Sequence, residues 1–295
     1  MAEPAHHHHG HGAGGALRAA AALTVGFAAL EALGGWWTGS LALLSDAGHM
    51  LTDGIALGLA ALAAWMARRP PSARHSYGLG RMEIFASFFN AATMLVIVAA
   101  IAFEALARFR EPTPVNGLGA ALIATVGLAL NIVVLRWIAP HSHDLNARGA
   151  KLHVLGDLLG SIAALASGAI ITLTQWTPAD PLASLLICGL IGASSVRLLR
   201  ESLHALMEGV PAGLSVEAIG GEMARVEGVV SVHDLHVWTL SGSRSALSAH
   251  VVVRSMTNWD FTLRELQRRL HDRFGIDHVT LQPESGVQPL VRHRH

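Results

Sequence analysis

The chain has 295 residues, of which 52% are hydrophobic and only 14% are charged. Its formal net charge is zero with histidine neutral, so it lacks the basic field of a nucleic-acid-binding protein, and we expect no nucleic-acid partner. The single cysteine, Cys188, excludes a disulfide framework or a thiolate metal cage within one chain. Aromatic residues are only 5%, so the apolar excess comes from long aliphatic blocks, which indicate a membrane protein.

The N-terminal segment, residues 1–15, is rich in histidine, with His6 to His9 followed by Gly10 and His11. An expression tag is one interpretation, but the interrupted run favours a native cytoplasmic tail. Such a tail would either collect metal ions through weak contacts or remain a solvated segment without a role. The stretch from His141 to Asp144 allows the same two interpretations.

Six apolar segments are long enough to cross a bilayer as helices. They cover about residues 16–37, 39–66, 82–106, 116–138, 149–173 and 181–199. Basic residues gather in alternate connections, which the positive-inside rule assigns to the cytoplasm: Arg68, Arg69, Arg74 and Arg81; Arg148 and Lys151; Arg197 and Arg200. Both termini are therefore expected in the cytoplasm, although Arg108 and Arg110 in an opposite loop argue against it.

From about residue 208 the charged residues return, and the pattern predicts a soluble α+β domain. We expect a helix near 216–226, strands at 229–240 and 246–253 around a Ser241-Gly242-Ser243 turn, an amphipathic helix at 261–274 and a strand at 278–282. This α-β-β-α-β order suits a small sheet with both helices on one face, acting as a regulatory or dimerisation module. The predicted domains are therefore 1–15, 16–207 and 208–295.

The same His-x-x-x-Asp pattern occurs in two predicted spans, as His49 to Asp53 and as His153 to Asp157. The i, i+4 spacing places both side chains of each pair on one helix face, about 6 Å apart at Cβ. An ionised carboxylate at mid-span costs about 2.5–3.5 kcal/mol, so a duplicated costly pattern indicates function rather than packing.

Two imidazoles and two carboxylates suit zinc, and leave cobalt, cadmium and nickel open, whereas magnesium and calcium prefer oxygen donors alone. Asp46 lies on nearly the same face as His49 and Asp53. It would line the ion path or orient a ligand, or else serve packing or capping. For Glu31 and Asn131 we expect contacts between helices.

Three stretches resemble the cation diffusion facilitator family over nearly the whole chain: the run Gly39–Asp53, the loop His75-Ser76-Tyr77-Gly78, and the segment Val232–Trp238. The chain is most similar to the zinc-transporting branch, in which paired His-x-x-x-Asp motifs mark the transport site; manganese members resemble Asp-x-x-x-Asp instead. The resemblance implies six spans, a homodimer, a ferredoxin-like cytoplasmic domain and metal exchanged for protons.

By the same resemblance, cytoplasmic metal ligands map onto His233, His250, His278 and Glu284, with His75 as an additional ligand. Pairing of the two predicted strands would bring His233 and His250 together. Leu79 stands where some bacterial members carry a further ligand, which argues against a separate site in the loop. Arg81 and Glu208 are similar to the family's charge pair between spans and soluble domain, which gives a hinge hypothesis.

The expected function is proton-coupled export of zinc across a bacterial inner membrane, because protons and metal compete for the same His and Asp ligands. The protein is expected not to be an enzyme; an intramembrane metallopeptidase would show His-Glu-x-x-His, which does not occur. The competing hypothesis is a membrane metal sensor without transport, which a flux measurement would distinguish.

Overall fold

The computed structural model describes residues 11–138, 145–241 and 244–285, and for residues 11–22, 137–138 and 145–154 it describes the backbone alone. These residues form two compact units. One contains the chain up to Leu59 together with Phe89–Leu198, and the other contains Ala60–Phe88 together with the chain from Leu199. The long helices α2, α3 and α6 each run from one unit into the other.

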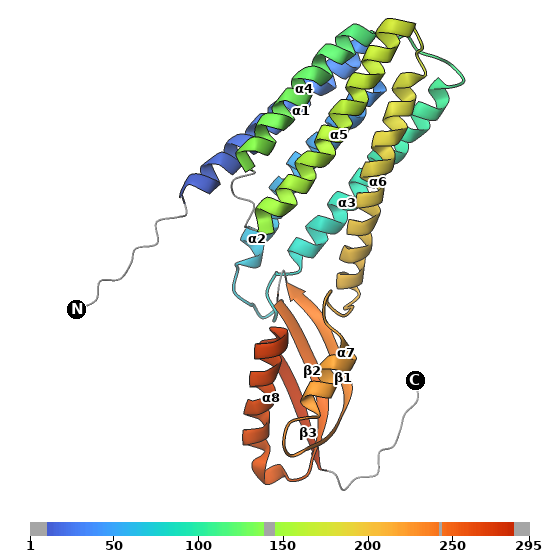
Figure 1. The fold of residues 1–295 in the computed structure, drawn as a ribbon. Coiled ribbons are helices and arrows are strands. Elements are labelled where there is room, and N and C mark those ends of the chain that lie inside the picture. The colour runs from blue at the N-terminus through green and yellow to red at the C-terminus, as the bar shows by residue number, and fades with distance from the viewer. Residues whose placement is uncertain (1–10, 139–144, 242–243, 286–295) are drawn as a thin grey trace, which may run out of the picture. The chain divides into compact units, whose positions relative to one another are not determined.

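Six long helices, which alternate in direction along the chain, make up the N-terminal two thirds (Figure 1). They are α1 (His11–Thr38), α2 (Leu41–Ala67), α3 (Met82–Arg108), α4 (Gly117–Ile138), α5 (Leu145–Thr174) and α6 (Ala179–Leu206). Helices α2 to α6 contain stretches that are long and apolar enough to cross a membrane, and α1 is the sixth helix.

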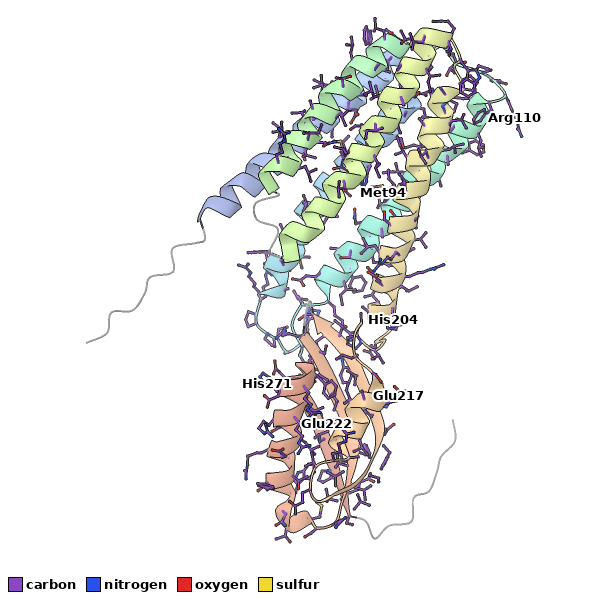
Figure 2. The ribbon with its side chains drawn as sticks, viewed as in Figure 1. Met94, Arg110, His204, Glu217, Glu222 and His271 are labelled. Carbon is purple, nitrogen blue, oxygen red and sulfur yellow. The ribbon has the colours of Figure 1, made fainter. Side chains whose placement is uncertain are left out.

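Small side chains allow the helices of the first unit to approach closely. A Cβ added at Gly168 in α5 would lie 2.7 Å from the backbone nitrogen of Ala121 and 2.8 Å from the carbonyl oxygen of Gly117, both in α4. A shared core then joins five helices through alanines and larger apolar residues: Ala42, Leu43, Met94, Ala120, Ala124, Ala164, Ile187 and Ile191. Met94 of α3 is labelled in Figure 2.

The outer faces of these helices are apolar. Trp36, Phe103 and Leu173 have exposed fractions of 80%, 77% and 84%. Such a surface would be unfavourable in water but is suited to lipid, where the helical backbone satisfies its own hydrogen bonds. The predicted membrane-helical class is therefore confirmed.

The C-terminal part follows the predicted α-β-β-α-β order (Figure 1). Its elements are α7 (Val216–Met223), β1 (Val229–Ser241), β2 (Arg244–Val253), a short 3-10 turn η2 (Met256–Asn258), α8 (Trp259–Phe274) and β3 (His278–Ser285). The sheet has the order β1-β2-β3, with β1 and β2 antiparallel and β2 and β3 parallel. The parallel pair requires a crossover, which α8 supplies.

One core packs α7 and α8 against the sheet. Ile219 and Met223 of α7 and Leu266 and Leu270 of α8 are all buried in the same cluster as the inward-facing residues of β1 and β2. The two helices are also joined by Glu222, labelled in Figure 2, whose carboxylate accepts hydrogen bonds from Arg269 and Arg273 at 3.0 and 2.8 Å. The small α+β domain is thus confirmed.

Candidate metal sites

Three of the four predicted transport ligands meet between α2 and α5. His49 Nδ1 lies 3.6 Å from Asp53 Oδ2 in the same helix, as the i, i+4 spacing requires. His49 Nε2 lies 3.6 Å from Asp157 Oδ1 in α5. Each contact uses a different ring nitrogen of His49, and one ion would bind only one of these nitrogens. The two contacts therefore bring the three side chains together without outlining a single ion position. His153 lies one turn before Asp157, but its side chain falls outside the described part.

Burial differs among the three side chains. Asp157 is 2% exposed, whereas His49 and Asp53 are 17% and 23% exposed. Removing a carboxylate from water is costly unless a cation or proton compensates for its charge. A nearby positive charge or a proton is therefore expected to compensate for Asp157.

Asp46 lies next to this group and contacts the same partner helix. It is 1% exposed, and Ser161 Oγ in α5 donates a hydrogen bond to its Oδ2 at 3.5 Å. Asn131 Nδ2 in α4 donates to Ser161 Oγ at 3.1 Å, so Asn131 does contact a neighbouring helix. Glu31 is fully buried and makes no hydrogen bond through its carboxylate among the described residues.

A second group of candidate ligands lies on the C-terminal sheet. His233 of β1 pairs directly with His250 of β2, and their ring centroids are 5.2 Å apart. Glu284 of β3 lies between them, with Oε2 3.0 Å from His233 Nε2 and Oε1 2.6 Å from His250 Nδ1. Hydrogen bonds from His250 and His233 lower the pKa of Glu284. The three residues can bring their ligand atoms within 4.8 Å of one another, close enough for one metal ion.

The other two predicted cytoplasmic ligands lie outside this group. His278, at the start of β3, makes an edge contact with Tyr77 at 5.5 Å between ring centroids. His75 lies in the connection between α2 and α3. The group of three that the described residues form contains neither histidine.

Two residues near this site were missed from sequence. Asp234 Oδ2 lies 3.8 Å from His250 Nε2, and Asp234 Oδ1 lies 3.1 Å from His236 Nε2. Asp234 has a φ of 52°, in the left-handed region, at an irregularity between His233 and His236 in the pairing of β1 with β2. A regular strand would send it to the opposite face from His233. No local sequence pattern predicts this bulge.

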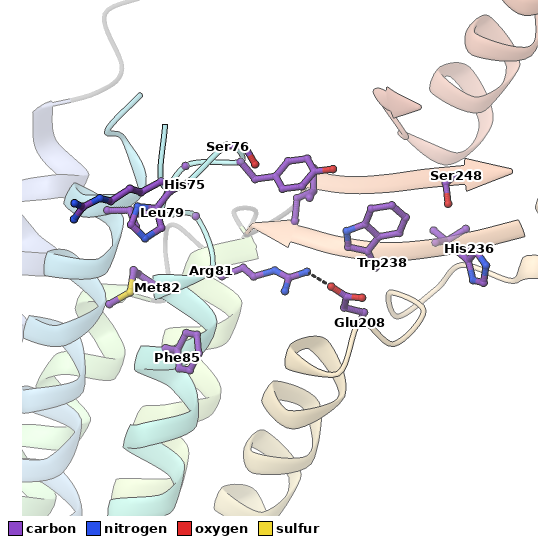
Figure 3. A pocket seen from close by; sticks show the side chains of 16 residues that line it. His75, Ser76, Leu79, Arg81, Met82, Phe85, Glu208, His236, Trp238 and Ser248 are labelled. Carbon is purple, nitrogen blue, oxygen red and sulfur yellow. Dashed lines mark hydrogen bonds and ion pairs between the residues drawn. The ribbon is translucent and has the colours of Figure 1, made fainter. Parts of the chain in front are cut away.

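A cavity of about 870 Å³ lies beside the α2–α3 connection in the second unit (Figure 3). His75, Arg81, His236 and Trp238 are among the residues that line it. Arg81 Nη2 lies 2.9 Å from Glu208 Oε1, and these side chains are 37% and 62% exposed. The predicted charge pair is thus formed, in a position accessible to water.

The model of the cation efflux transmembrane domain matches residues 17–207 of this chain, and that of the cation efflux protein cytoplasmic domain matches residues 211–286. The chain belongs to the cation efflux family. It is 42% identical over 286 residues to the zinc transporter ZitB of Pectobacterium atrosepticum, covering 95% of this chain and 89% of that protein.

Two further relatives extend the comparison. The zinc transporter ZitB of Escherichia coli is 44% identical over 266 residues, covering 89% of this chain and 84% of that protein. A cadmium, cobalt and zinc/H(+)-K(+) antiporter of Bacillus velezensis is 39% identical over 272 residues, covering 90% of this chain and 86% of that protein. These matches confirm the resemblance to the cation diffusion facilitators and their zinc-transporting branch. The chain is thus an integral membrane protein of a metal-efflux transporter family.

Proposed function

We propose that this efflux protein exports zinc from the cytoplasm in exchange for protons. The observation that carries the proposal is His49, whose two ring nitrogens each lie 3.6 Å from a carboxylate oxygen, one in α2 and one in α5. The two ZitB relatives, which are zinc transporters, support zinc as the substrate, and the zinc/H(+)-K(+) antiporter supports protons as counter-ions. The same donors would accept cadmium, cobalt or nickel.

The transport site would consist of His49, Asp53, His153 and Asp157. Two carboxylates balance the charge of the divalent ion, and two neutral imidazoles complete a tetrahedral set. Protonation of the same groups releases the metal, so one site can carry either cargo. A site that opens alternately to each side then couples proton entry to metal exit.

The arrangement in the membrane also belongs to this proposal. The protein would lie in a bacterial inner membrane with both termini in the cytoplasm, and the distribution of basic residues among the connections supports this orientation. Residues 16–207 would form the transport domain, 1–15 a tail, and 208–295 a cytoplasmic module through which a homodimer assembles. The match to the cytoplasmic domain of cation efflux proteins supports that module.

The group formed by His233, His250 and Glu284 would bind zinc as a regulatory ion. Imidazole and carboxylate donors from three neighbouring strands are already close enough to share one ion. Asp46 would orient the transport site from a neighbouring turn. Arg81 and Glu208 would form a hinge contact.

The deciding experiment is zinc flux into proteoliposomes under an imposed pH gradient, repeated with manganese. Wild type should move zinc in a proton-dependent way, and Asp157→Asn should reduce the flux at least about 100-fold because a buried ligand is lost. Asp260→Asn, the same change at an exposed position in α8, is the matched control. Zinc binding by wild type without flux would instead establish a metal sensor.

A further inference from the structure

The backbone at the start of α2 is held by a carboxylate from another helix. Asp180 lies in the first turn of α6 and is fully buried. Its Oδ2 accepts a hydrogen bond from the Leu41 backbone nitrogen at 2.7 Å, and its Oδ1 accepts one from Ala42 nitrogen at 3.3 Å and one from Ser40 Oγ at 2.6 Å. These contacts join segments about 140 residues apart.

Every unpaired donor at this helix end is thereby satisfied. A helix begins with N–H groups that have no partner within the helix, and buried donors of this kind must be bonded elsewhere. Asp180 serves Leu41 and Ala42. Ser40 Oγ accepts from the nitrogen of Leu43 at 3.3 Å, and Thr38 Oγ1 accepts from the nitrogen of Ser40 at 3.4 Å.

Helix α3 also takes part in this contact. Arg108, the last residue of α3, has Nη1 3.6 Å from Asp180 Oδ2, and the same nitrogen donates to the carbonyl oxygen of Gly39 at 2.7 Å. The guanidinium and the positive end of the α2 dipole both compensate for the buried carboxylate. We call Ser40, Arg108 and Asp180 the α2 clamp. All three residues lie in the first unit.

We propose that Asp180 is a positioning residue for transport, fixing the height and rotation of α2 against α3 and α6. His49 lies nine residues after Ser40 and therefore about 13 Å along the helix. A slip or rotation of α2 at the clamp would carry His49 and Asp53 out of alignment with Asp157. This proposal rests on the transport site proposed above.

The clamp should stay closed during the transport cycle. Opening it would leave backbone donors and a buried carboxylate without partners, which is unfavourable inside a protein. The three helices would therefore move about this point, with larger displacements away from it.

The single cysteine of the chain can report on the contact between α2 and α6. Cys188, the single cysteine, is buried in α6 two turns after Asp180, and its Sγ lies 3.7 Å from Ser45 Oγ in α2. If the clamp holds the helices together, its loss should expose this thiol to N-ethylmaleimide. The labelling rate reports on the contact whether or not zinc is transported.

The test compares Asp180→Asn, Arg108→Gln and the matched control Glu111→Gln, an exposed acid that follows α3, as purified full-length proteins with a chelator present. Asp180→Asn should label Cys188 at least about tenfold faster than wild type, Arg108→Gln should show a smaller increase, and the control none. In proteoliposomes, Asp180→Asn should raise the zinc concentration for half-maximal flux about tenfold. Circular dichroism and elution volume confirm that each variant is folded.

An unchanged labelling rate in folded Asp180→Asn overturns the proposal, as does faster labelling with an unchanged half-saturating zinc concentration. If Asp180→Asn does not fold, the labelling rate of Arg108→Gln is the deciding measurement. A rate equal to that of wild type in this variant overturns the proposal. Failure of the proposed function is distinguishable, because wild type would then show no zinc flux while the labelling rates still report on the clamp.

Discussion

At the scale of single residues, His49 connects the two helices of the candidate transport site. Its two ring nitrogens each lie 3.6 Å from a carboxylate oxygen, one of Asp53 and one of Asp157. A neutral ring offers a nitrogen to a borderline-soft ion such as zinc. A protonated ring pairs with the carboxylates and leaves no donor for metal. His49 is therefore the position at which ion preference is most open to change.

We predict that His49→Asp shifts ion preference from zinc towards manganese. Replacing an imidazole by a carboxylate hardens the ligand set, which favours the harder ion. The ratio of zinc to manganese flux in proteoliposomes should fall at least about tenfold, roughly what loss of one suitable donor costs. The wild type and the exposed Asp260→Asn variant give the reference ratio. An unchanged ratio would show that His49 does not contribute to ion choice.

The group formed by His233, His250 and Glu284 gives a prediction about the pKa of its carboxylate. The hydrogen bonds from His250 and His233 lower the pKa of Glu284, so their contribution to stability is complete above the ordinary glutamate pKa and is lost as pH falls through the lowered value. His250→Ala should raise the pKa of Glu284 towards its ordinary value. A carboxyl ¹³C titration of the metal-free protein measures this shift, with His236→Ala as the control.

At the scale of elements, much of the fold was predictable because local patterns determine it. Long apolar blocks predict the membrane helices, and alternation predicts β1 and β2. The pairing of His233 with His250 follows from two strands joined by a short turn. Glu284 was named only through the family resemblance, because it comes from β3, whose parallel register against β2 is set by tertiary packing.

Asp180 was missed for a related reason. In the sequence it is only an acid just before the last predicted span, while its partners lie about 140 residues earlier. No periodicity within either helix specifies which acid caps which helix. Contacts of this kind depend on how the helices pack, and this packing cannot be predicted from the sequence of one helix alone.

The close packing of α4 and α5 predicts a sharp difference between two glycines. Gly168→Ala should destabilise the protein by about 1–3 kcal/mol, because the new Cβ would meet the backbone of α4 at 2.7 Å. Gly189→Ala in α6 should be neutral or stabilising, since nothing lies within 4 Å of its added Cβ. Thermal unfolding midpoints in detergent measure both. Equal midpoints would show that the two helices can separate at no cost.

At the scale of the whole molecule, the charge pair of Arg81 and Glu208 joins the start of α3 to the segment that follows α6. Both side chains are partly exposed, so the pair is expected to contribute at most about 1 kcal/mol to stability. The pair would therefore act by orienting the two segments that it joins, and not by stabilising the fold. The two effects can be separated because orientation changes flux without changing the unfolding midpoint.

We predict that Arg81→Glu reduces zinc flux several-fold, because it replaces an attractive pair by two like charges, and that the exchanged pair Arg81→Glu with Glu208→Arg restores it. Unfolding midpoints should stay close to wild type in all variants. Arg110→Glu, in a different connection, controls for the change in net charge. Recovery in the exchanged pair would establish that the interaction itself matters. Persistent loss in that variant would show that Arg81 or Glu208 acts on its own, and the hinge hypothesis would fail.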